Sequence, residues 1–197
     1  LHLSIRRQRQ MCIRDRLYSW LRTLVCVCLG MVLLFTFVVR LIRVDGESMR
    51  ETLLQDGDIL VAVSRYLAGD LSQGDIVIVR DEYFKDGQPI VKRVIATEGQ
   101  TVDIDFETGI VYVDGQALDE PYTREPTYQD EGTVFPLTVP EGELFLLGDN
   151  RNNSEDSRSA DLGTVEERCL LGKAVFLLFP GKSADTQQRD FSRLGGV

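Results

Sequence analysis

Three short segments bring together residue types that enzymes use for chemistry. The first, residues 45–53, carries Ser48 directly after a long apolar run. The second, residues 91–95, reads Val-Lys-Arg-Val-Ile, so Lys92 and Arg93 interrupt a β-branched stretch. The third, residues 148–158, reads GDNRNNSEDSR and is almost wholly polar, although it follows the apolar run 144–147. These segments offer hydroxyl, amine, guanidinium and carboxylate groups.

Each segment also has an ordinary structural interpretation. Ser48 followed three residues later by Glu51 matches a capping box, so Ser48 is compatible with a helix N-cap or a turn serine. Lys92 is compatible with a solvated lysine on an edge strand. If the segment is instead a strand inside a sheet, Lys92 and Arg93 point to opposite faces, so one enters a buried site while the other pairs elsewhere. The third segment is unusually dense in hydrogen-bonding groups for a plain surface loop.

Histidine and cysteine usage excludes several kinds of site. The only histidine is His2, in a terminal segment, so a serine-histidine-aspartate triad and histidine-bearing zinc motifs are excluded. The four cysteines include no C-x-x-C pair, which supports neither a disulfide framework nor a zinc ribbon. We therefore expect no metal ion and no cofactor.

The charge is distributed very unevenly along the 197 residues. Residues 1–43 carry 8 basic and 1 acidic residue, and residues 44–197 carry 14 basic and 30 acidic residues. The formal charges of the two parts are therefore +7 and −16. An acidic body repels the phosphates that dominate nucleic-acid binding, so we expect no nucleic acid as partner.

An apolar anchor lies near the N-terminus. Residues 23–39 contain no charge, and residues 20–42 together approach the thickness of a bilayer as a helix. A buried core helix and a cleaved signal peptide are the alternatives, but no small-x-small cleavage site follows the run. Most flanking arginines precede the span, which places residues 1–19 in the cytoplasm and the acidic body outside. Residues 1–16 show no periodicity, and their MCIRDR resembles translated adapter read-through, so we give this tail little weight and leave open whether it is native.

The body, residues 43–180, is predicted to be mainly β. Short β-branched runs alternate with glycine and aspartate, and no long helical period occurs. Thr108-Gly109 between two alternating runs predicts a hairpin, and Asp114-Gly115 predicts a further turn. We expect residues 119–140, rich in proline and acids, to form an inserted excursion, and residues 181–197 to form a loose tail. The predicted strands are residues 58–63, 75–80, 90–96, 102–105, 110–113, 144–147 and 173–179.

Taken together, the three segments resemble the type I signal peptidases of peptidase family S26. The resemblance covers about residues 20–180 and continues in Leu-Gly-x-Val at 162–165 and Gly-Lys-Ala at 172–174. It implies a signal peptidase or SOS-repressor type of β catalytic domain behind one transmembrane helix. It also implies a bacterial membrane enzyme near the export machinery, with the lipid bilayer and preprotein signal peptides as partners.

The resemblance assigns roles to individual residues. Ser48 becomes the nucleophile, its backbone N–H the oxyanion donor, and Lys92 the general base, which must be neutral at working pH. Ser154 is expected to orient Lys92. The supporting ion pairs are implied to involve Asp149, Arg93, Asp156 and Arg158. The departures from the family pattern are Gly46, where some members carry a serine hydroxyl, Glu51, where proline is usual, and residues 96–100.

Specificity in this family is for small residues, typically alanine, at the first and third positions before the cut. We expect the extended substrate to add as a strand beside the segment leading to Lys92. By motif alignment the candidate pocket walls are Val44, Met49, Leu53, Ile78, Ile90 and Val91, although core packing explains each equally well. Two alternatives stay open: a self-cleaving serine-lysine protease of the SOS-repressor type, and a membrane-tethered binding protein that has lost catalysis.

Overall fold

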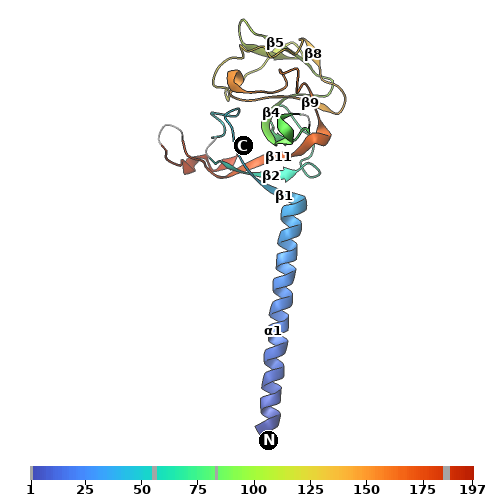
Figure 1. Cartoon of the computed structure of the whole chain (residues 1–197), viewed down its shortest axis with the longest axis vertical. Coiled ribbons are helices and arrows are strands. Elements are labelled where there is room, and N and C mark those ends of the chain that lie inside the picture. Colours follow the sequence, from blue (N-terminus) through green and yellow to red (C-terminus); the bar gives the residue numbers. More distant parts are fainter. Residues whose placement is uncertain (1, 55–56, 83, 184–186) are drawn as a thin grey trace. The chain divides into compact units, whose positions relative to one another are not determined.

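The chain forms two compact units, residues 1–39 and residues 40–197. The computed structural model describes residues 2–54, 57–82, 84–183 and 187–197, with the side chains of the first helix from Arg16 onward. Figure 1 shows the course of the chain.

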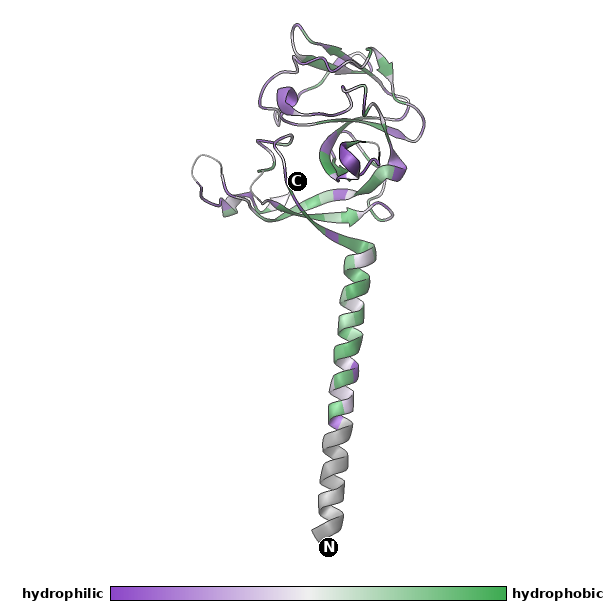
Figure 2. Ribbon diagram, in the orientation of Figure 1, coloured by the Kyte–Doolittle hydropathy of each residue, from purple (hydrophilic) through white to green (hydrophobic). Residues whose placement is uncertain are grey.

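The first unit is one long helix. Helix α1 (His2–Leu33) continues as a π-helical turn, η1 (Leu34–Val38). Within the described residues, Arg16–Val38 is a stretch long and apolar enough to cross a membrane, with a mean hydropathy of 2.3. Figure 2 shows the ribbon of this stretch as mostly hydrophobic, with a few hydrophilic residues. The lack of periodicity in residues 1–16 gave no sign that the helix extends back to His2.

The anchor ends earlier than we expected. The predicted span covers residues 20–42, but Val39–Arg43 form strand β1, which pairs with β2 at the edge of the main sheet. A β-branched and apolar stretch suits both a membrane helix and a strand, so composition alone did not locate this boundary.

The second unit is mainly β, as predicted from the sequence. The strands are β2 (Ile59–Ser64), β3 (Ile76–Val79), β4 (Ile90–Thr97), β5 (Thr101–Asp105), β6 (Ile110–Val113), β7 (Gln116–Ala117), β8 (Leu137–Thr138), β9 (Glu143–Leu147), β10 (Val165–Glu166), β11 (Leu170–Phe179) and β12 (Gly195–Gly196). Short 3-10 turns lie between them: η2 (Lys85–Gly87), η3 (Arg151–Asn153), η4 (Glu167–Cys169) and η5 (Phe191–Arg193).

The strands form a large sheet and a small one. The large sheet has the order β1-β2-β11-β3-β4-β9-β10, with β12 added to β11, and the small sheet has the order β7-β6-β5-β8. The small sheet lies at the end of the domain away from β1 and β2 (Figure 1). Its β8 uses residues 137–138, so a short strand of the small sheet lies inside the expected excursion 119–140.

Both predicted turns are present. Asp105 begins the β5–β6 hairpin and accepts hydrogen bonds from the backbone N–H groups of Glu107 and Thr108. Asp114 and Gly115 join β6 to β7 with φ values of 52° and 75°. Positive φ at both central residues is the two-residue hairpin geometry that Asp-Gly favours.

Three apolar clusters hold the domain together, and the first lies behind the candidate site. It joins residues of β2, β3 and β11 to Met49 and Leu53, which are 1% and 0% exposed. The third cluster packs the small sheet against β4 and β9. The loop containing Ser48 is therefore anchored in the core by the two apolar side chains that follow the serine.

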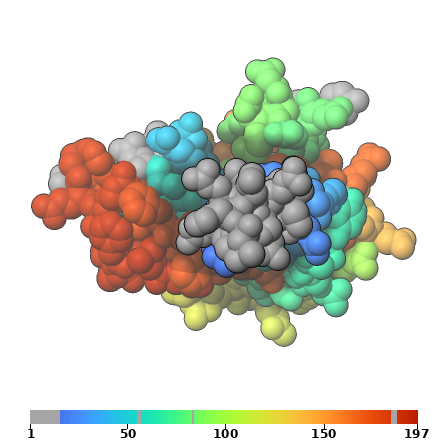
Figure 3. All heavy atoms as spheres, turned by 90° about the horizontal axis from the view of Figure 1, so that it is seen from below, coloured from blue at the N-terminus to red at the C-terminus, as the bar shows by residue number. Residues whose placement is uncertain are grey.

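The expectation of a loose C-terminal tail was wrong for its described part. Gly195–Gly196 pairs with Phe176 and Leu177 of β11, and Phe191 packs edge-on against Phe179 at 5.8 Å between ring centroids. The C-terminal residues gather on one side of the domain (Figure 3). Polar composition suggested mobility, but a few aromatic and charged side chains are enough to hold the segment.

Candidate active site

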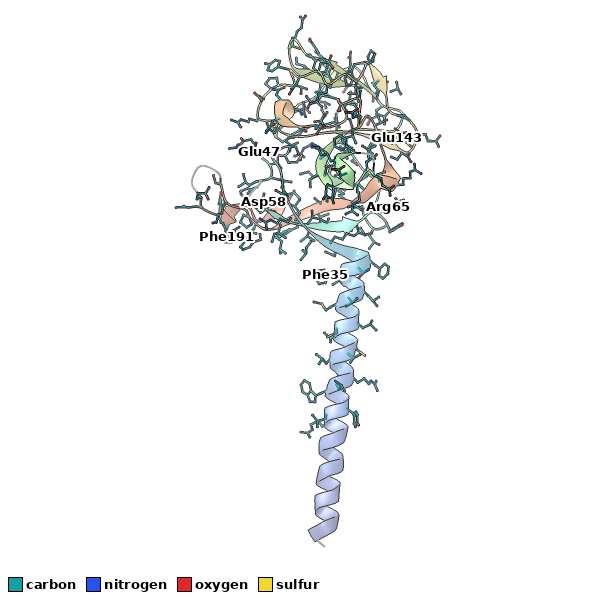
Figure 4. The ribbon with its side chains drawn as sticks, viewed as in Figure 1. Phe35, Glu47, Asp58, Arg65, Glu143 and Phe191 are labelled. Atoms are coloured by element: carbon teal, nitrogen blue, oxygen red, sulfur yellow. The ribbon has the colours of Figure 1, made fainter. Side chains whose placement is uncertain are left out.

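Ser48 lies in a tight turn between β1 and β2. The backbone N–H of Arg50 donates to the Glu47 carbonyl at 3.0 Å, and that of Leu53 donates to the Met49 carbonyl at 2.7 Å. Residues 48–52 form turns and not a helix, so Ser48 is a turn serine and not a helix N-cap. Ser48 itself is half-buried, and Glu47, labelled in Figure 4, marks this turn in the fold. We call residues 47–54, which carry the candidate nucleophile Ser48, the nucleophile turn.

Lys92 lies in the middle of the large sheet and is buried. It sits on β4 opposite Val77 of β3, and it is 1% exposed. Its Nζ donates to Ser154 Oγ at 2.7 Å, and Ser154 Oγ donates to Asp156 Oδ2 at 2.7 Å. The solvated edge lysine is therefore excluded, and the amine ends in a short polar chain.

The surroundings of Lys92 favour its neutral form. Burial lowers the pKa of Lys92 from 10.5 to about 8, and the carboxylate of Asp156 opposes part of that shift. The charges of Lys85 and Arg158 lower this pKa further, and that of Glu131 raises it. An amine with a pKa near 8 is half neutral at that pH and can accept a proton.

Asp156 is kept ionised although it is completely buried. Burial acts to raise its pKa, but the hydrogen bond and charge of Arg158, the charge of Lys92 and the Gly148 N–H together outweigh burial, so the pKa of Asp156 lies below its ordinary value. Arg158 Nε donates to Asp156 Oδ1 at 2.8 Å, and the Gly148 N–H donates to Oδ2 at 3.0 Å. A buried carboxylate with this many donors is a fixed negative charge beside the lysine chain.

Arg93, the neighbour of Lys92 on β4, serves a second network. Its Nε and Nη2 donate to the two oxygens of Asp149 at 2.8 and 2.6 Å, a bidentate pair that is almost fully buried. Thr52 Oγ1 donates to Asp149 Oδ2 at 2.5 Å, and the ring of Tyr122 covers the guanidinium at 4.0 Å. Asp149 thus ties β4 to the nucleophile turn.

The polar loop 148–154 also holds the nucleophile turn by its backbone. The N–H of Asn150 donates to the Ser48 carbonyl at 2.9 Å, and its side-chain amide donates to the Glu47 carbonyl at 3.0 Å. A Cβ at Gly148 would collide with Ser154 Oγ and with the Ser48 carbonyl oxygen. The close approach of the two loops therefore requires glycine at this position.

One cleft of about 610 Å³ contains both candidate groups. Ser48 and Lys92 both line it, together with Ser154 on the loop after β9. Among the described residues, no hydrogen bond joins Ser48 Oγ directly to Lys92 Nζ. The remaining lining residues are Val44, Asp45, Gly46, Glu47, Met49, Lys85, Gln88, Pro89, Ile90, Val91, Asn153 and Glu155.

The structure divides the six candidate pocket residues into two groups. Val44, Met49, Ile90 and Val91 line the cleft. Leu53 and Ile78 are fully buried and pack behind it in the same apolar cluster as Val44 and Met49. In the described part of the chain, no group of three or more histidine, cysteine, aspartate or glutamate side chains is placed to hold a metal ion.

Comparison with known families agrees with this geometry. Residues 17–179 match the family described as "Signal peptidase, peptidase S26". The chain belongs to this family. It is 32% identical to the signal peptidase I of Bacillus licheniformis over 176 residues, covering 85% of this chain and 91% of that protein. It is 37% identical to the probable signal peptidase I-1 of Synechocystis sp. over 164 residues, covering 80% of each protein. A crystal structure of an Enterococcus faecalis signal peptidase I is 32% identical, with a TM-score of 0.43, and the match covers 52% of this chain and 95% of that one.

The departures from the family pattern lie at different distances from the cleft. Gly46 lines the cleft with φ of 112°, so no side-chain hydroxyl is available there. Glu51 has φ of 85°, a value that proline cannot adopt, and its exposed carboxylate lies 4.0 Å from Arg124 Nε. Residues 96–100 close the turn between β4 and β5, where the Gln100 N–H donates to the Thr97 carbonyl.

Sequence reasoning missed three contributors to the site. Thr52 donates to Asp149, Asn150 holds the nucleophile turn, and Gly148 permits the close approach of the two loops. All three stand within the segments that the sequence singled out. Their roles depend on contacts between residues about one hundred positions apart, which no local pattern signals.

Proposed function

We propose that this chain is a membrane-anchored serine endopeptidase that removes signal peptides from exported preproteins. Ser48 is the nucleophile and Lys92 the general base in this proposal. The observation that carries it is the buried amine of Lys92, with its pKa lowered to about 8, in the cleft that also contains Ser48. Membership of the signal peptidase family supports the substrate class.

The reaction begins when neutral Lys92 takes the proton of Ser48 Oγ as this oxygen attacks the scissile carbonyl carbon. Negative charge builds on the carbonyl oxygen, where the backbone N–H of Ser48 donates to it. The Lys92 ammonium then gives its proton to the leaving amine, and an ester remains on Ser48. Water, deprotonated by Lys92, attacks the ester carbonyl, and Ser48 is regenerated with release of the signal peptide as an acid.

Ser154 and Asp156 have a defined part in this cycle. Lys92 becomes positive in each half-reaction, and the chain through Ser154 connects it to a fixed negative charge. Ser154 also fixes the direction of the amine by its 2.7 Å hydrogen bond. The pair Arg93–Asp149 positions β4 relative to the nucleophile turn, and Arg158 keeps Asp156 ionised.

Selection of small residues follows from the apolar walls of the cleft. Val44 and Met49 belong to the segment between β1 and β2, and Ile90 and Val91 belong to β4, the strand that carries Lys92. All four residues line the same cleft. An extended substrate between these segments presents alternate side chains to one wall, as the first and third positions before the cut require. We expect these apolar walls to favour alanine over larger residues at these positions.

The proposal places α1 in the cell membrane. The apolar stretch Arg16–Val38 supports a single span. The excess of arginine before this stretch favours a cytoplasmic N-terminus and an extracytoplasmic catalytic domain close to the export machinery.

Cleavage of a preprotein with an Ala-x-Ala site by the detergent-solubilised full chain tests the proposal. Mass spectrometry locates the cut, which we expect after the second alanine, and the Ser48→Ala and Lys92→Met variants should leave the preprotein intact. An inert but folded wild-type chain between about pH 7 and 10, the range that brackets the pKa of Lys92, would favour the membrane-tethered binding protein instead.

A further inference from the structure

The C-terminal tail contacts the nucleophile turn. Arg193, in the short turn η5, extends its guanidinium to two acceptors near the end of the nucleophile turn. This residue lies beyond the part of the chain that matches the family, residues 17–179. Its contacts therefore need an explanation of their own.

Asp58 is the first acceptor, and it is completely buried. Arg193 donates to it twice, from Nη1 to Oδ1 at 3.1 Å and from Nη2 to Oδ2 at 2.9 Å. The same carboxylate accepts the backbone N–H of Leu54 at 2.7 Å and that of Gly181. Asp58, labelled in Figure 4 with the tail residue Phe191, thus joins the end of the nucleophile turn to the tail.

Thr52 is the second acceptor, through its carbonyl oxygen, which takes a hydrogen bond from Arg193 Nη2 at 2.8 Å. The hydroxyl of the same threonine donates to Asp149, the partner of Arg93. A continuous set of hydrogen bonds therefore runs from the tail through Thr52 to the strand that carries Lys92. The residue four positions after Ser48 is held from two sides.

We propose that Arg193 is a positioning residue for catalysis, which fixes the nucleophile turn through Asp58 and Thr52. Removing its guanidinium leaves the Thr52 carbonyl without this donor and the buried Asp58 carboxylate without its cation. The turn then gains freedom at Thr52 and Leu54, and Ser48 is less often placed for attack. Displacements of about 1 Å can cost on the order of 100-fold in rate.

The tail offers a matched control in Arg189. Its guanidinium donates to the Pro180 carbonyl at 2.6 Å and covers the Phe179 ring at 4.7 Å. These contacts hold the tail on β11 and include no residue of the nucleophile turn. Substituting Arg189 loosens the tail without removing a bond to Thr52 or Asp58.

The experiment compares Arg193→Ala, Arg193→Lys and Arg189→Ala in the full detergent-solubilised chain. We expect kcat per folded molecule to fall about tenfold or more for Arg193→Ala, with KM changed less than twofold because Arg193 does not line the cleft. Millimolar ethylguanidinium should restore part of this loss. The kcat of Arg193→Lys should lie between those of the wild type and Arg193→Ala. Arg189→Ala should retain the wild-type kcat. Hydrogen exchange at the Leu54 amide should quicken in Arg193→Ala alone.

A purely structural role predicts another pattern. If Arg193→Ala lowers thermal stability but keeps the wild-type kcat, or if Arg189→Ala loses as much activity, the inference is overturned. Because it rests on the proposed role of Ser48, Ser48→Ala is measured alongside. Activity in that variant would defeat the proposed function, and the exchange rate at Leu54 would then decide whether Arg193 fixes this turn.

Discussion

The sign of the coupling between Asp156 and Lys92 gives a demanding prediction. Asp156 raises the pKa of Lys92, so Asp156→Asn should lower the pH at which activity appears. Two hydrogen bonds of 2.7 Å each connect the groups, which puts Lys92 Nζ and Asp156 Oδ2 no more than about 5.4 Å apart. At this separation and an effective dielectric constant of about 20, their attraction is about 3 kcal/mol, which is equivalent to about two pH units.

The assay is kcat/KM against pH for wild type and variant. With a pKa of about 8, about a tenth of Lys92 is neutral at pH 7, so the wild-type value should rise about tenfold from pH 7 to 9. A midpoint lowered by about one to two pH units leaves a rise of about twofold or less in Asp156→Asn. The asparagine oxygen can still accept from Ser154 and Gly148, which keeps the hydrogen bond that orients Ser154, while its amide nitrogen replaces the oxygen that accepts from Arg158 Nε.

Asp161→Asn is the matched control, because Asp161 is an exposed carboxylate of the same loop region and does not act on Lys92. Its midpoint should stay at the wild-type value. A midpoint that rises or stays unchanged in Asp156→Asn would show that the titrating base is not Lys92 beside this carboxylate.

Three further outcomes follow from the same geometry. Gly148→Ala should lower kcat on the order of 100-fold, because its methyl group displaces Ser154 and the Ser48 carbonyl, and activity within twofold of wild type would contradict that packing. Lys92→Met should raise the free energy of unfolding by about 1 to 3 kcal/mol at pH 7, since burial disfavours the ammonium. The pKa of Lys92 is lower in the folded state than in the unfolded state, so wild-type stability rises between about pH 8 and 10.5. The stability advantage of Lys92→Met therefore shrinks over this range. Denaturant titration monitored by circular dichroism at several pH values tests this. Glu51→Gly should stabilise the fold by up to about 1 kcal/mol because φ is positive, whereas Glu51→Pro should destabilise it; equal unfolding midpoints for the two would contradict the observed turn.

Much of the domain was predictable because local rules decide it. The alternation in residues 102–105 and the Asp114-Gly115 pair specify strands and a turn from short-range sterics, and both are present. The consecutive bases Lys92 and Arg93 in a β-branched run pointed to a strand that serves two networks. In the structure Lys92 donates to Ser154 and Arg93 donates to Asp149, so the two side chains do serve separate networks.

The rest depended on contacts between distant segments. Val39–Arg43 is apolar enough for a membrane helix, and only its pairing with β2 makes it a strand. The tail has few apolar residues, but Arg193 donates to the buried carboxylate of Asp58, 135 positions earlier in the chain. The ring of Tyr122 covers Arg93 from within an irregular, proline-rich stretch. Such pairings are fixed by the folded topology and have no period or local motif.

Identification of the acylated residue tests the central claim most directly. The full chain is mixed with an Ala-x-Ala preprotein, quenched in acid within the first turnover, digested and mapped by mass spectrometry. We predict that the signal peptide is attached as an ester to the peptide containing Ser48, and that no adduct forms in Lys92→Met. An adduct on any other residue, or product formation by Ser48→Ala, would contradict the assignment of Ser48 and Lys92.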